Sequence, residues 1–162
     1  MSKQAFLILE DGSIYYGDSF GYQGETFGEI VFNTSMTGYQ EMLTDPSYAG
    51  QIVVPTYPLL GNYGINPSDV ESREIQVSGF VVRQYCEEPS HTKETQTLNE
   101  YLVSQEIVGI SEVDTRAITR RIRSKGVMMG AIAVNVSPEQ ALKQLKTKPA
   151  YDELNFVQKV TA

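Results

Sequence analysis

The pattern of apolar and polar positions along the chain predicts a series of short strands. AFLIL and SIYYG flank Asp11 and Gly12, a pair typical of a two-residue hairpin turn, because that turn requires positive φ. The remaining apolar runs are rich in Val and Ile, which strands favour. These runs cover residues 29–33, 52–58, 75–82, 107–110 and 129–134.

Helices are predicted between and after these strands. Thr37 and Gln40 form a capping box that opens a short helix, and this helix must end before Pro46, since proline disfavours helical geometry at the preceding residue. Start signals mark three later helices. They are 95–106, capped by Thr95 or Thr97, a helix from Asp114 or Thr115 to about Gly126, and a helix begun by Ser137 and Pro138.

The order of these elements predicts the fold class. Strands alternating with short helices in the second half indicate βαβ-like units, and the N-terminal hairpin adds antiparallel pairing. We therefore expect one mixed α/β domain, which a chain of 162 residues can form without a disulfide or a metal. Residues 147–162 have weak periodicity and a proline, so the predicted organisation is a domain over 1–146 followed by a linker.

Composition and charge exclude several classes of protein. No apolar run approaches the ~20 residues of a membrane span, so we expect no membrane partner. A net charge of −7 opposes general binding to nucleic acid, because polyphosphate is repelled at long range. The single cysteine excludes an internal disulfide framework and indicates a reducing, cytoplasmic setting.

The charge is unevenly distributed along the chain. The segment 115–125, TRAITRRIRSK, has no acidic residue, although it contains several of the 13 basic residues of the chain. One interpretation is a solvated helix whose isoleucines pack on the sheet. The others are a site for an anionic ligand or an acidic partner; RNA is a weaker candidate, since the helix has no aromatic side chain to stack on bases.

Other kinds of site find no support in the sequence. Cys86 and His91 could form a nucleophilic pair, but Glu87 and Glu88 oppose the lowered thiol pKa that such a cysteine needs. One histidine and one cysteine are also too few ligands for zinc. No dinucleotide-binding or P-loop glycine motif is present. We therefore expect no catalytic residue, no metal and no cofactor in this chain.

Residues 37–51, TGYQEMLTDPSYAGQ, combine turn-forming residues with many hydroxyl groups. The stretch from Asp45 to Tyr48 is typical of a type I turn, and in the simplest interpretation Ser47 is a turn hydroxyl. Small and hydroxyl residues at both ends of a short helix would also allow close approach of a polar ligand or another chain. The residues alone leave both interpretations open.

Four motifs together resemble a known family. They are FNTSMTGYQE at 32–41, LTDPSY at 43–48, TYPLLGNYG at 56–64 and DTRAITRRIRSKG at 114–126. In this order and spacing they closely resemble the N-terminal domain of the small, glutamine amidotransferase subunit of carbamoyl-phosphate synthase. The resemblance covers essentially the whole chain. It implies a three-layer β/β/α fold of the swivelling type, with mixed parallel and antiparallel strands.

The resemblance also implies the partners of the domain. In the family, a class I amidotransferase domain with a Cys-His-Glu triad follows this domain and hydrolyses glutamine. The ammonia passes to a large subunit, which uses ATP, Mg and bicarbonate to make carbamoyl phosphate for arginine or pyrimidine synthesis. The N-terminal domain packs against the large subunit and borders the glutamine cleft. We therefore expect a heterodimeric, cytoplasmic ligase complex.

The sequence departs from the family pattern in one respect. Cys86 does not match the position of the family's nucleophile, and no G-x-C-x-G motif is present. We therefore expect the 162 residues to be inactive alone. A piece of a longer protein, with 147–162 as linker towards the amidotransferase domain, is the favoured explanation, and a naturally short chain is the other.

The resemblance carries residue-level expectations. Ser47 is expected to hydrogen-bond glutamine, since a hydroxyl can donate to a carboxylate and accept from an ammonium group. Asp114, Arg116, Arg120 and Arg121 are expected either to contact the large subunit or to support the fold through helix capping and arginine pairs. An independent module that binds RNA or an anionic ligand through the basic helix is the alternative function.

Overall fold

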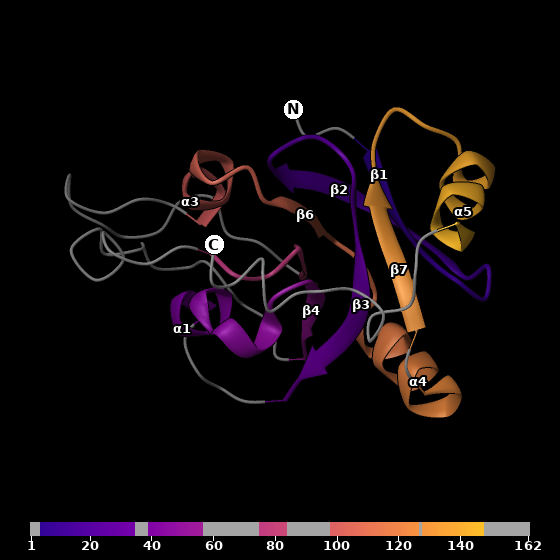
Figure 1. Cartoon of the computed structure of the whole chain (residues 1–162), viewed down its shortest axis with the longest axis horizontal. Helices are drawn as coiled ribbons and strands as arrows, with labels where there is room; N and C mark the ends of the chain where they lie inside the picture. Colours follow the sequence, from indigo (N-terminus) through magenta and orange to yellow (C-terminus); the bar gives the residue numbers. More distant parts are fainter. Residues whose placement is uncertain (1–3, 35–38, 57–74, 84–97, 127, 148–162) are drawn as a thin grey trace.

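The structure is a computed structural model that describes residues 4–34, 39–56, 75–83, 98–126 and 128–147. Within these residues seven strands close into a barrel in the order β1-β2-β6-β5-β4-β3-β7 (Figure 1). The strands are β1 (Gln4–Leu9), β2 (Ile14–Gly21), β3 (Thr26–Asn33), β4 (Gln51–Pro55), β5 (Gly79–Val81), β6 (Val108–Ser111) and β7 (Met128–Ala133).

Strand pairing divides the barrel into an antiparallel half and a parallel half. β1 pairs antiparallel with β2 and β7, and β7 also pairs antiparallel with β3. From β3 through β4 and β5 to β6, each neighbouring pair is parallel. The carboxyl ends of four consecutive strands therefore meet at one edge of the barrel, where loops and helix starts gather side chains from distant parts of the sequence.

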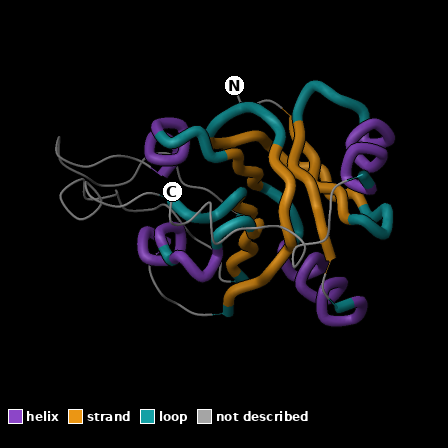
Figure 2. The backbone as a smooth tube through the Cα atoms, in the orientation of Figure 1, coloured by secondary structure: helices purple, strands orange, loops and turns teal. Residues whose placement is uncertain are grey.

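The helices lie outside the barrel on different sides. They are α1 (Tyr39–Thr44), a 3-10 turn η1 (Pro46–Tyr48), α3 (Leu98–Ser104), α4 (Thr115–Lys125) and α5 (Pro138–Lys146). Figures 1 and 2 show α1 and α3 on one side of the strands, α5 on the opposite side and α4 near one end. The helix α5 packs on β1 and β7, while α4 contacts β3 and β4.

Alternating side chains along the strands build separate cores. In β1, Leu7 and Leu9 point into the main cluster in the barrel, whereas Phe6 and Ile8 pack outwards into a cluster beneath α5. This period of two is the expected consequence of strand geometry. A further cluster joins the outer side of β4 and β5 to α1 and α3, and the fully buried Phe80 belongs to it.

The predicted N-terminal hairpin is confirmed, but its turn is not the predicted one. Gly12 has positive φ (92°), whereas Asp11 is absent from the positive-φ residues of the described chain. The Leu9 N–H donates to the Ser13 carbonyl (2.9 Å), and the Gly12 N–H donates to the Leu9 carbonyl (2.8 Å). The loop is therefore one residue longer than a two-residue turn, with glycine at the left-handed position that such hairpins require.

The predicted mixed α/β class is confirmed, with two corrections in detail. The predicted strand 75–82 is paired only over Gly79–Val81, although Ile75 and Val77 are still buried. Parallel βαβ units occur at β3-α1-β4 and β5-α3-β6, whereas β7 after α4 pairs with β1 and β3. The strands form a single closed barrel, and the three-layer swivelling arrangement is not confirmed.

Helix boundaries agree with the capping signals where the structure describes them. α1 ends at Thr44, before Pro46, and α4 and α5 begin after the caps Asp114 and Ser137. The predicted caps Thr37, Thr95 and Thr97 lie outside the described residues, as do Cys86, His91 and the predicted linker from 148 onwards. No described helix is long and apolar enough to span a membrane.

Candidate functional site: an arginine cleft beside a serine turn

The basic helix α4 is fixed to the barrel by its cap and by its apolar face. The Asp114 side chain accepts a hydrogen bond from the Ala117 N–H (3.0 Å), which satisfies one free donor of the first turn. Ile118 and Ile122 are buried and belong to the cluster inside the barrel. The helix ends at Gly126, whose φ of 85° is readily adopted by glycine. The arginines are therefore held on a rigid element.

The exposed residues of α4 form two separate faces. Arg116, Arg120 and Arg123 follow one another at spacings of four and three residues, so they lie along one side of the helix. Arg121 lies on the next side, with Ala117 one turn before it and Ser124 almost one turn after it. All four arginines are exposed to solvent.

The first of these faces lines a cleft, which we call the arginine cleft. Its volume is about 370 Å³, and its lining residues are Thr34, Thr56, Arg116, Thr119, Arg120 and Arg123. Thr34 directly follows β3 and Thr56 directly follows β4, so both come from the carboxyl ends of paired parallel strands. Open α/β sheets commonly bind ligands at this edge. The cleft thus joins three positive charges to the loop edge of the parallel strands.

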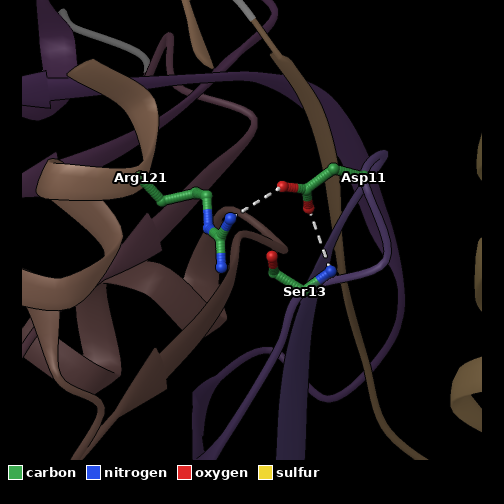
Figure 3. Close-up of polar contacts among 3 residues, drawn as sticks. All are labelled: Asp11, Ser13 and Arg121. Carbon is green, nitrogen blue, oxygen red and sulfur yellow. Dashed lines mark hydrogen bonds and ion pairs between the residues drawn. The ribbon is translucent and has the colours of Figure 1, made fainter. Parts of the chain in front are cut away.

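Arg121 makes a contact within the chain that the cleft arginines do not make. Its Nη1 lies 3.7 Å from Oδ2 of Asp11 in the β1–β2 loop, and the other carboxylate oxygen of Asp11 accepts from the Ser13 N–H at 2.9 Å (Figure 3). Burial raises the pKa of Asp11, but the Ser13 hydrogen bonds and the Arg121 and Lys125 charges together hold this pKa below its ordinary value. Arg121 therefore ties α4 to the hairpin.

Arg123 is positioned by an aromatic ring. Its guanidinium carbon lies 5.1 Å from the centre of the Phe32 ring, within the range of a cation–π contact. Phe32 is half-buried in β3 and packs against the cluster inside the barrel. Arg123, at one end of the arginine cleft, is therefore held in place. Among the described residues, no carboxylate lies within ion-pair distance of Arg116 or Arg120.

The chemistry of the arginine cleft is that of an oxyanion site. Guanidinium groups present forked N–H donors that match carboxylates and phosphates. The hydroxyls of Thr119 and Thr56 donate to the backbone carbonyls of Thr115 (2.8 Å) and Asn33 (3.2 Å). Among the residues that the structure describes, the lining contains no acidic, histidine or cysteine side chain, and no group of three or more potential metal ligands occurs. Guanidinium groups gathered in this way can attract an anion.

Ser47 lies on a separate, well-defined turn. Asp45 accepts from the Ser47 N–H at 3.0 Å, and Pro46 begins the 3-10 turn η1 that carries the exposed Ser47. The neighbouring Tyr48 accepts a hydrogen bond from the Asn33 amide at 2.6 Å, which fixes the turn to the end of β3. The predicted turn geometry is confirmed, and the hydroxyl of Ser47 is displayed at a fixed place on the surface.

The predicted site residues do not all come together. Arg116 and Arg120 line the arginine cleft, Asp114 caps the helix, Arg121 contacts the hairpin, and the cleft lining does not include Ser47. Sequence reasoning missed Thr34 and Thr56 as lining residues. Thr34 directly follows the predicted strand 29–33, which was an available signal, because parallel strands end at a common edge. Thr56 lies within the predicted run 52–58 and follows a strand only because β4 ends at Pro55.

Comparisons with known proteins identify the family. The family model described as "Carbamoyl-phosphate synthase small chain, CPSase domain" matches residues 7–132. The chain is 56% identical over 151 residues to the carbamoyl phosphate synthase small chain of Thermotoga maritima, covering 93% of this chain and 38% of that protein. The corresponding proteins of Solidesulfovibrio magneticus and Aquifex aeolicus are each 51% identical, with 97% and 100% of this chain and 42% and 44% of theirs covered.

These relatives are longer than this chain, which spans about two fifths of their length. Among solved structures, an aminopeptidase from Aneurinibacillus sp. strain AM-1 covers 83% of this chain and 32% of its own, with a TM-score of 0.43 and 9% identity, too low to carry an argument. The matched family region runs from β1 into β7 and includes the whole of α4 and the Ser47 turn. The chain belongs to the family of the carbamoyl-phosphate synthase small chain, in its CPSase domain.

Proposed function

We propose that this chain is the part of a glutamine-hydrolysing carbamoyl-phosphate synthase small subunit that contacts the large synthetase subunit and borders the glutamine site. The family match over residues 7–132 carries the proposal. The rigid, exposed arginine face of α4 supports it, because a charged surface held on a packed helix suits a protein interface. In this role the chain supports ammonia delivery for carbamoyl phosphate synthesis in the arginine or pyrimidine pathways.

Ser47 is proposed to hydrogen-bond the glutamine substrate. Its exposed position on η1, fixed by the Asp45 and Tyr48 contacts, supports this role, since a hydroxyl on a rigid turn needs little ordering when a ligand arrives. One hydrogen bond contributes only about 1 kcal/mol net, so Ser47 alone gives no measurable glutamine affinity. The rest of the glutamine site then comes from the amidotransferase domain.

The catalytic groups of the complex are proposed to lie outside these residues. The arginine cleft offers anion-binding groups without a nucleophile or base, and this supports a binding role over a catalytic one. ATP and Mg are assigned to the large subunit, the glutaminase triad is assigned to the amidotransferase domain, and the complex is placed in the cytoplasm. The isolated chain is then inactive as an enzyme.

Two measurements test the proposal. The isolated chain should form a complex with the large synthetase subunit in sedimentation velocity at micromolar concentration, and it should release no ammonia from glutamine. In the assembled enzyme, Ser47→Ala should raise the KM for glutamine about fivefold to tenfold, the effect of one lost hydrogen bond, with little change in kcat. Ser104→Ala, an exposed serine on α3, is the matched control. Glutaminase turnover by the chain alone would contradict the proposal.

The second candidate function is an independent module for RNA or a free anionic ligand. The arginine cleft favours it to the extent that about 370 Å³ suits a small ligand. The acidic net charge of −7 opposes RNA, because the body of the protein repels a long polyanion. Salt-dependent retention of single-stranded RNA by the chain, lost in an Arg120, Arg121 and Arg123 charge-removed variant, would support this alternative.

A further inference from the structure

We propose that the arginine cleft is the docking site for a carboxylate-bearing segment of the large synthetase subunit, with Arg116 and Arg120 as its specific contacts. The inference rests on the proposed function and adds to it the place, the residues and the chemistry of the contact. It also separates the arginines of α4, which the sequence left together, into those that support the fold and those that bind.

The four arginines of α4 divide into two pairs by their contacts. Arg121 faces Asp11 at 3.7 Å, and Arg123 lies over the Phe32 ring at 5.1 Å. Both side chains therefore have contacts within the chain that hold α4 against the hairpin and β3. Arg116 and Arg120 are exposed, and within the described residues neither has a carboxylate at ion-pair distance. Their guanidinium groups are available to a partner.

The charged face of α4 is longer than one small anion. Residues 116 and 123 are seven positions apart, which corresponds to about 10 Å along a helix axis. A single phosphate or carboxylate is too small to contact the whole of this face. A second cleft of about 450 Å³ adjoins it across Arg120, lined by Tyr15, Ala117, Arg120, Arg121 and Ser124. The positive surface thus continues beyond one small ligand, as a segment with several carboxylates requires.

The charge of α4 is opposite to that of the rest of the molecule. The chain has a net charge of −7, so an acidic segment is repelled by most of its surface and attracted to α4. Complementary charge of this kind guides association and fixes orientation. Thr34 and Thr56 lie at the same cleft and place the ends of β3 and β4 at the interface. Asn33 at the end of β3 donates a hydrogen bond to Tyr48 of the Ser47 turn (2.6 Å), so docking here would fix the edge proposed to border glutamine.

The test measures the affinity of the intact chain for the large subunit by biolayer interferometry at several salt concentrations. Arg116→Gln with Arg120→Gln should weaken binding about 10- to 100-fold at low salt and should reduce the salt dependence. The matched control is Lys143→Gln with Lys146→Gln, which removes the same charge from exposed positions on α5. It should change the affinity by no more than about twofold to threefold, since these charges lie away from the contact.

A conservative variant keeps the test independent of folding and of net charge. Arg120→Lys retains the charge but loses the forked donor, so it should weaken binding by about threefold to tenfold if carboxylates pair there. All variants should have the far-UV circular dichroism and melting temperature of the wild type. Inorganic pyrophosphate in the millimolar range should compete with the large subunit for the wild-type chain and have little effect on the double variant.

The outcomes separate this inference from the proposed function. Wild-type binding with equal affinity for the double variant would overturn the docking site and leave the proposed function standing. Absence of wild-type binding would overturn both. Stabilisation of the wild-type chain by pyrophosphate, with large-subunit affinity unaffected by the double variant, would assign the cleft to a free anion and overturn the docking proposal.

Discussion

The helices α4 and α5 are built alike but present different surfaces. Each begins at a side-chain cap and buries apolar residues about one turn apart against the barrel, Ile118 and Ile122 in α4 and Ala141 and Leu145 in α5. The exposed side of α5 mixes Glu139 with two lysines, whereas the exposed side of α4 has arginines and a lysine without an acid.

Packing on the barrel explains the buried side of both helices but does not explain the exposed charges of α4. Glu139 and Lys143 stand four residues apart in the favourable order, as on an ordinary solvated helix. Arg116 and Arg120 have the same spacing with like charges, an arrangement that weakens an isolated helix by a few tenths of a kcal/mol. The charges of this pair therefore do not stabilise the helix. A partner that neutralises the charges gives it a physical reason.

The largest expected effects come from truncating the buried side chains that pack α4 and α5 on the barrel. Ile118→Ala should lower the free energy of unfolding by about 3 kcal/mol, because the side chain is fully buried in the cluster that fills the barrel. Leu145→Ala should cost about 2 kcal/mol, since it lies in the last turn of α5, which can shift to fill the space. Urea denaturation measures both values.

The matched control for these truncations is Val103→Ala, at an exposed position on α3, which should change stability by less than about 0.5 kcal/mol. Equal losses from the α4 and α5 variants would contradict the expectation that the space left in the barrel cluster at Ile118 relaxes less than the space left beneath α5 at Leu145.

Removal of the helix caps of α4 and α5 should give stability losses of intermediate size. Asp114→Ala should destabilise the protein by about 1 kcal/mol, because it removes both the hydrogen bond to the Ala117 N–H and a negative charge at the helix start. Ser137→Ala should cost about 0.5 kcal/mol, since the cap is uncharged and Pro138 still fixes the first turn. Thermal denaturation at low and high salt separates the charge effect, and a larger loss for Ser137→Ala would reverse the predicted order.

The smallest effect concerns the pair that fixes Arg121. Asp11→Asn should lower stability by no more than about 0.5 kcal/mol at neutral pH, because the pair is partly exposed and screened by salt. The folded state lowers the pKa of Asp11, so its contribution is present above the ordinary pKa of an aspartate and is lost as pH falls through the folded-state pKa. Urea denaturation of both proteins across acidic pH should show their stabilities converging. A difference that grows on acidification would contradict this sign.

The sequence predicted local structure well where one residue or pair has a strong preference. Pro46 limits α1, Asp114 and Ser137 begin α4 and α5, and glycine occupies the left-handed position of the hairpin loop. It failed in the exact turn, because Asp-Gly fits both a two-residue and a longer loop, and only the pairing of the two strands chooses between them.

The same limit applies to the functional residues. The charge of α4 and the turn at Ser47 follow from the sequence, since each depends on neighbours in the chain. The assignment of Arg121 to Asp11 and of Arg116 and Arg120 to the cleft could not be predicted, because Asp11, Thr34 and Thr56 come from distant strands. Helical spacing gives the faces of α4 but does not say what each face meets.

The sequence by itself determined the mixed α/β class, most of the elements and the family, because periodicity, caps and motifs are local properties of the chain. The tertiary structure decided the place of β7, the strand that follows α4 in the chain. It pairs with both β1 and β3 and so closes the barrel. Such pairing depends on contacts between residues about a hundred positions apart or more. Other long-range contacts place Arg121 against Asp11 and put Arg116 and Arg120 in a cleft beside Thr34 and Thr56, at the ends of β3 and β4.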